Sequence, residues 1–69
     1  MDAIEKELSS RKDEIKKELE LLFKANMKIT NWDVPEANDN EAAKILVDII
    51  QEALDEIKQD IKNGNYNNF

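Results

Sequence analysis

Apolar residues near the N-terminus recur three or four positions apart, which is the spacing of one face of an α-helix. The stripe they form consists of Ile4, Leu8, Ile15, Leu19 and Leu22. Because charged residues occupy most of the other positions, this spacing predicts one amphipathic helix over residues 2–28. The stripe is narrow, so we expect it to pack against a single neighbouring helix.

Charged residues interrupt this stripe halfway along, at Arg11 and Lys12. Ser10, followed three residues later by Asp13, could cap the start of a second helix at this point. Oppositely charged residues nevertheless continue at helical spacing through the interruption, namely Glu7 with Arg11, Asp13 with Lys17 and Glu20 with Lys24. We therefore predict one continuous helix, and a break near Ser9 and Ser10 is the alternative.

The helical pattern stops after Met27, and the segment TNWDVPEANDN follows at residues 30–40. It contains the only proline, Pro35, which cannot continue a helix and which biases Val34 toward extended geometry. This composition predicts a turn over residues 30–38. We expect Trp32 and Val34 to fold back over the end of a helical bundle, and the alternative for Trp32 is an anchor for a ligand or partner.

A second helix is predicted over residues 39–63. Asn38, with Glu41 three residues later, fits a capping box at its start. At its end, Lys62 suits the negative helix terminus and Gly64 suits the left-handed conformation that terminates helices. Two long helices joined by one turn predict an all-α fold, a single domain over residues 1–69 built as an antiparallel helical hairpin.

Residues 64–69, which follow the second helix, are mostly polar. We expect them to form a flexible tail. Tyr66 and Phe69 are the exceptions to the polar composition. A tail aromatic that docks into a groove of a partner protein is the alternative interpretation of these two residues.

The second helix carries more apolar surface than one neighbouring helix can cover. One stripe, which matches the first helix, consists of Ala43, Val47, Ile50, Leu54, Ile57 and Ile61. A second apolar group lies beside this stripe and consists of Ala42, Ile45, Leu46, Ile49 and Ala53. Since the first helix offers only a narrow stripe, another surface must cover the second group.

A second copy of the chain is the simplest cover for this group. Two hairpins would then form a four-helix bundle, with Leu21, Phe23 and Met27 of the first helix available at the same junction. Two alternatives remain at this point. A different protein could cover the group, or the turn could fold back over Ile45 and Ile49 and give a compact monomer.

Composition strengthens the expectation of a partner. The chain has 69 residues with no cysteine and no histidine, so neither a disulfide nor a usual zinc site can stabilise its small core. It also has no hydrophobic stretch of membrane-spanning length and no secretory signal, and we expect a soluble cytoplasmic protein.

The net charge of −6 is unevenly distributed. Residues 1–30 carry seven acidic and seven basic residues, whereas residues 31–69 carry nine acidic residues against three lysines. This excess argues against direct binding of nucleic acid or of an anionic membrane, because phosphate groups attract cations. A basic protein partner remains compatible with it.

The acidic residues of the second helix share one face: Glu41, Asp48, Glu52, Asp55 and Glu56. Charged outer faces are the rule for bundle helices, so the simplest interpretation is a solvated surface. The alternative is that this face docks onto a basic groove of a partner, including a groove that otherwise holds nucleic acid. The chain would then act as an acidic inhibitor or nucleic-acid mimic.

Little in the sequence indicates catalysis. Glu52 and Asp55 form an E-x-x-D pair that resembles half of the magnesium site of all-α nucleotide pyrophosphohydrolases, a resemblance over four residues. The first helix lacks the E-x-x-E partner that this family's site requires. We therefore expect no enzyme activity, cofactor, metal or small-molecule substrate. The predicted function is a non-enzymatic interaction module, adaptor, chaperone-like or regulatory, built as a homo-oligomeric bundle.

Overall fold

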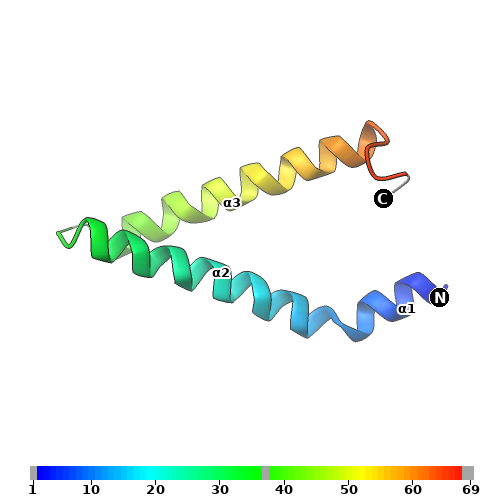
Figure 1. Cartoon of the computed structure of the whole chain (residues 1–69), viewed down its shortest axis with the longest axis horizontal. Coiled ribbons are helices and arrows are strands. Elements are labelled where there is room, and N and C mark those ends of the chain that lie inside the picture. The colour runs from blue at the N-terminus through cyan, green and yellow to red at the C-terminus, as the bar shows by residue number, and fades with distance from the viewer. Residues whose placement is uncertain (1, 37, 68–69) are drawn as a thin grey trace.

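The structure, a computed structural model, describes residues 2–36 and 38–67, and this part of the chain contains three helices and no strand. They are α1 (Ala3–Ser10), α2 (Lys12–Asp33) and α3 (Asp39–Lys62). The predicted all-α class is confirmed. Figure 1 shows α2 and α3 running antiparallel, close together at the turn that joins them and diverging toward the two termini.

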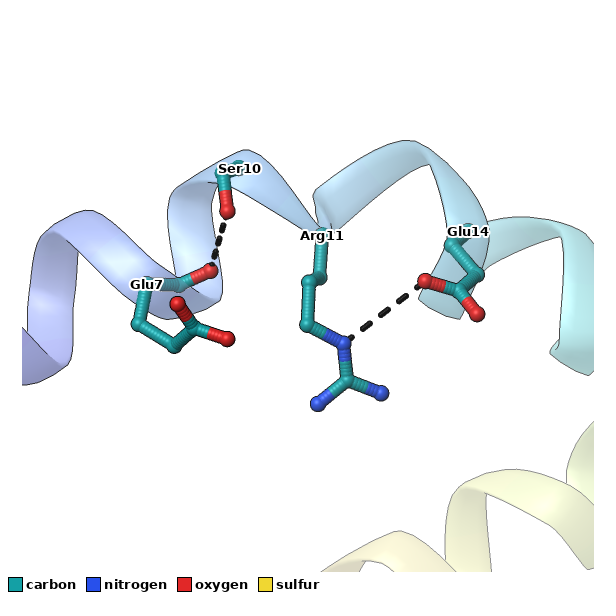
Figure 2. A network of polar contacts seen from close by, with 4 residues as sticks. All are labelled: Glu7, Ser10, Arg11 and Glu14. Atoms are coloured by element: carbon teal, nitrogen blue, oxygen red, sulfur yellow. Dashed lines mark hydrogen bonds and ion pairs between the residues drawn. The ribbon is translucent and has the colours of Figure 1, made fainter.

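The prediction of one continuous first helix is wrong, because the chain breaks at Arg11. This residue has φ −101° and ψ 5°, and its N–H donates to the carbonyl oxygen of Leu8 at 3.1 Å. The Ser10 hydroxyl donates to the Glu7 carbonyl oxygen at 2.6 Å (Figure 2). Such bonds from a serine to a carbonyl in the preceding turn bend helices, which accounts for the break here.

The alternative that we considered, a new helix capped by Ser10, is also only partly right. The N-cap residue of α2 is Arg11, not Ser10, and it makes no side-chain capping bond. Arg11 does not pair with Glu7 as its spacing suggested, since its Nε atom lies 3.6 Å from Oε2 of Glu14 (Figure 2). The predicted pair of Glu20 with Lys24 is confirmed, at 2.8 Å.

The helix α2 extends five residues beyond its predicted end, so the turn is shorter than expected. The N–H of Val34 donates to the Thr30 carbonyl oxygen at 2.8 Å and closes the last turn. The helix therefore ends at Asp33, with Val34 as its C-cap next to Pro35, because proline disfavours helical geometry at the residue before it. Trp32 lies in this last turn and is 85% exposed, so the prediction that it plugs the end of the bundle is wrong for the single chain.

Both ends of α3 follow the sequence prediction. The N–H of Glu41 donates to Oδ1 of Asn38 at 3.1 Å, which is the expected cap. At the other end, Gly64 has φ 79°, and two bonds close a Schellman motif: Gly64 N–H to Ile61 O and Asn65 N–H to Asp60 O, both 3.0 Å. The N–H of Asn67 then donates to Gly64 O at 3.2 Å. Residues 64–67 thus form turns, the flexibility of residues 64–69 stays a prediction, and Phe69 lies outside the described residues.

None of the described residues is buried. The radius of gyration is 15.9 Å, whereas a compact domain of this length has about 11 Å. The accessible surface is 6357 Å², roughly 1,900 Å² more than the surface of a compact monomer of the same mass. The helices of one chain therefore do not enclose a core.

The left-handed conformation of Gly64 gives a testable expectation. We expect Gly64→Ala to destabilise the fold by about 1 kcal/mol and to lower the midpoint of thermal unfolding by roughly 5 °C. A Cβ atom at this position would also lie 3.0 Å from Nδ2 of Asn67. Circular dichroism melts would measure the shift.

Gly64→Asn is the matched control, because asparagine adds the same Cβ atom but tolerates the left-handed region better than alanine. It should lose less stability than Gly64→Ala. Equal losses in the two variants, or no loss in either, would contradict the role assigned to this glycine.

Candidate functional site

The two long helices contact each other near the turn, where the chain has its best-covered residues. The half-buried side chains of α2 are Phe23, Asn26, Met27 and Thr30, and those of the facing part of α3 are Ala42, Ala43, Leu46 and Ile50. Phe23 and Met27, which we expected at a junction between two copies, thus lie on the side of α2 that turns toward α3. Leu22 belongs to the predicted stripe yet remains 52% exposed.

A shallow groove of about 310 Å³ lies at the turn end of this contact. Its lining consists of Thr30, Val34, Asn38, Glu41, Ala42, Ile45, Leu46 and Ile49. Four of the five predicted self-association residues therefore share one groove, and the fifth, Ala53, is exposed one turn beyond Ile49. Val34, which we expected to fold back over the end of the bundle, lines this groove, whereas the contribution of Thr30 was missed because it depends on the unpredicted extension of α2.

A second groove, of about 430 Å³, lies farther from the turn, between the diverging parts of α2 and α3. Its lining consists of Lys16, Leu19, Glu20, Phe23, Val47, Ile50, Gln51 and Leu54. Charged groups belong to this lining, and Glu20 is also paired with Lys24. The hydrogen bond and the positive charge of Lys24 lower the pKa of the Glu20 carboxyl below its ordinary value.

The predicted acidic face is exposed along α3, and none of its residues forms an ion pair with another described residue. In the described part of the chain, the two ion pairs join Arg11 to Glu14 and Glu20 to Lys24, both before the turn. All five acidic-face residues are exposed: Glu41, Asp48, Glu52, Asp55 and Glu56. The polar contact of this face is a hydrogen bond from Gln51 Nε2 to Asp55 Oδ1 at 3.0 Å. Its negative charge is therefore open to a partner or to solvent.

Glu52 and Asp55, the pair that resembles half of a magnesium site, lie on this open face. Among residues 2–36 and 38–67, no group of three or more histidine, cysteine, aspartate or glutamate side chains is arranged to hold a metal ion.

The candidate aromatic anchors lie at opposite ends of the molecule. Trp32 is in the last turn of α2, beside the loop to α3, whereas Tyr66 follows the far end of α3 and is 40% exposed. Figure 1 shows these two regions separated by the length of α3. The two side chains therefore cannot contribute to one site within a single chain.

Comparisons of the sequence with protein-family models and with curated proteins, and of the structure with solved structures, find no match. None of the helices in the described part of the chain is long and apolar enough to cross a membrane.

The pair of Glu20 and Lys24 gives a second testable expectation. Because Lys24 lowers the pKa of Glu20, Lys24→Gln should raise that pKa toward its ordinary value. Lys17 lies nearby and acts only through a weaker charge effect, so Lys17→Gln should raise it less. Titration of the Glu20 side-chain carbon by NMR would measure both shifts. An unchanged Glu20 pKa in Lys24→Gln would contradict the pairing.

Proposed function

We propose that this chain is a small non-enzymatic protein-interaction module, an adaptor, chaperone-like or regulatory protein of the cytoplasm, that works as a homo-oligomeric helical bundle. The observation that carries this proposal is the exposure of its apolar residues: none of those that the structure describes is buried. A single chain in solution would therefore expose most of the apolar surface of its helices.

The energetics favour a partner for this surface. Full burial of one isoleucine side chain contributes about 1.5–3 kcal/mol, and a core of this size rarely supplies more than about 3–5 kcal/mol in total. Ile45 and Ile49 are 54% and 56% exposed. Covering both in an oligomer would therefore contribute a large part of the stability of the folded state.

A four-helix bundle is the arrangement that we propose for the oligomer. Each chain supplies the antiparallel pair of α2 and α3, and the second copy covers the group formed by Ala42, Ile45, Leu46, Ile49 and Ala53. The acidic face of α3 and the aromatic residue Trp32 then remain on the outside, where a different protein can bind. This surface serves as the module's contact with other proteins.

Mutation of Ile49 tests the oligomer directly. We expect light scattering coupled to size exclusion to give a mass of two chains for the wild type. Ile49→Asp should raise the dissociation constant at least about 100-fold, because each dimer loses two buried isoleucines and gains two carboxylates at an apolar contact.

Gln59→Asp is the control for this variant, since it adds the same side chain to the charged side of the same helix. It should leave the mass unchanged. A dimer that persists in Ile49→Asp would remove the proposed contact, and dissociation by Gln59→Asp would show that added charge alone is responsible.

A second function is supported by the unneutralised acidic face. In this proposal the chain is an acidic inhibitor or nucleic-acid mimic, whose carboxylates occupy a basic groove of a partner protein. The rigid spacing of the acidic residues along α3 and the lack of any ion pair there support it. It requires no change in the helical bundle, since the face lies on the outside.

The salt dependence of binding separates this function from the first. Proteins captured by the immobilised chain should be basic and should dissociate as the salt concentration rises well above about 0.1 M, where screening becomes strong. The triple variant Asp48→Asn, Glu52→Gln and Asp55→Asn should lose them. Neutralisation of Glu5, Glu7 and Asp13, an equal change in net charge elsewhere, should not. Capture that resists salt or shows no preference for basic proteins would exclude this function.

A further inference from the structure

We infer that the second copy of the chain docks on one particular side of the α2–α3 pair, which we call the aliphatic flank. We define it by Leu22 and Ile29 of α2 together with Ile45 and Ile49 of α3. This inference rests on the proposed self-association and assigns it to a surface. It also adds residues of α2 that the pattern of α3 alone does not indicate.

The positions of these residues follow from the helical repeat of about 100° per residue. On α2, the half-buried residues Phe23, Asn26, Met27 and Thr30 mark the side that faces α3. Leu22 and Ile29 lie roughly 100° around the helix from the centre of that side. They are 52% and 58% exposed, so α3 of the same chain does not cover them.

Half-buried residues and the helical repeat also give the orientation of α3. Its half-buried residues near the turn, Ala42, Ala43, Leu46 and Ile50, mark the side that faces α2. Ile45 and Ile49 lie roughly 95° around from the centre of that side, in the same rotational sense as Leu22 and Ile29 on α2. Because α2 and α3 are antiparallel (Figure 1), the same rotational sense brings both pairs to one side of the molecule.

The second groove, between the diverging parts of α2 and α3, is less suited to a contact between copies. Lys16 and Glu20 line the groove there, and Glu20 is hydrogen-bonded to Lys24 at 2.8 Å. Burial of such a charged pair costs desolvation free energy that the attraction between the charges often fails to offset. A contact with two-fold symmetry also requires a patch that is complementary to itself, and the four aliphatic side chains of the flank meet that condition, with Glu41 of the same groove at its edge.

The exposed area fits a second copy. Relative to a compact monomer, the chain exposes roughly 1,900 Å² of additional surface. Obligate homodimers bury about 1,000–2,500 Å² on each partner, whereas many transient contacts bury only about 800 Å² or less. Docking of one further copy can therefore remove the excess completely. The antiparallel pair of the partner presents the same aliphatic flank, equal in length and in chemistry.

The test compares two aliphatic residues of α2 that are equally exposed but lie on different sides. Ile29, in the aliphatic flank, is 58% exposed, and Leu21, which the helical repeat places roughly 170° around α2 from the centre of the side that faces α3, is 56% exposed. We expect Ile29→Asp to raise the dissociation constant of the dimer at least about 30-fold and Leu21→Asp to change it less than about 3-fold. Light scattering gives the mass, and circular dichroism shows whether each variant remains helical.

A chemical measurement keeps the test decisive if Ile29→Asp unfolds. The chain has no native cysteine, so Ile29→Cys and Leu21→Cys each introduce a single thiol. When both variants are dimeric, maleimide should modify the thiol of Ile29→Cys at least about 10-fold more slowly than that of Leu21→Cys, because the second copy covers position 29. Equal rates in a dimeric protein would overturn the assignment of the flank.

These measurements distinguish failure of the aliphatic flank from failure of the self-association. If the wild type is dimeric and Leu21→Asp dissociates it while Ile29→Asp does not, the aliphatic flank is wrong and the homo-oligomeric module stands. If the wild type has the mass of one chain at every concentration, the self-association itself is wrong. A different protein would then have to cover the flank.

Discussion

Two packed helices shield each other along one narrow strip, and apolar residues outside that strip stay in water unless another surface meets them. In this chain the apolar residues of α3 spread over about half of its circumference, from Ile45 on one side to Val47 on the other. The α2–α3 contact half-buries Leu46 and Ile50 but leaves Ile45 and Val47 more than 50% exposed. The open shape, the lack of buried residues and the proposed oligomer all follow from this limit.

The charge distribution is consistent with the same arrangement. In the described residues, the ion pairs lie on the segment before the turn, and Asp48 and Asp55 of the acidic face lie on the side of α3 opposite α2. An oligomer built through the aliphatic flank therefore leaves these carboxylates in water, where they need no compensating cation. Glu41 lines the groove that holds Ile45 and Ile49, so the contact between copies and the acidic docking surface adjoin along α3.

Local signals predicted the helix ends of α3 well. Asn38 caps its start and Gly64 closes its end, because both depend on hydrogen bonds within a few residues. Proline also acts locally, yet α2 extends to Asp33 where the apolar pattern predicted an end near residue 28. Polar residues such as Asn31 can continue a helix without contributing to its apolar stripe, so periodicity alone underestimated the length.

Other features depend on competition between bonds or on packing, and the sequence pattern did not resolve them. Ser10 could have capped a new helix, but its hydroxyl bonds backward to Glu7 and the chain breaks at Arg11. The side of α2 that faces α3 is set by Phe23 and Thr30, not by the stripe through Leu22. That choice requires knowing how the two helices pack, and it determines which residues remain available to a second copy.

The central claim is that folding and association of this chain are coupled, and its most direct test is the thermal unfolding midpoint as a function of protein concentration. For a dimer that unfolds to two separate chains, the midpoint should rise by roughly 5 °C for each tenfold increase in concentration. A midpoint that does not change over a hundredfold range of concentration would show that the single chain is stable alone, and would contradict the account.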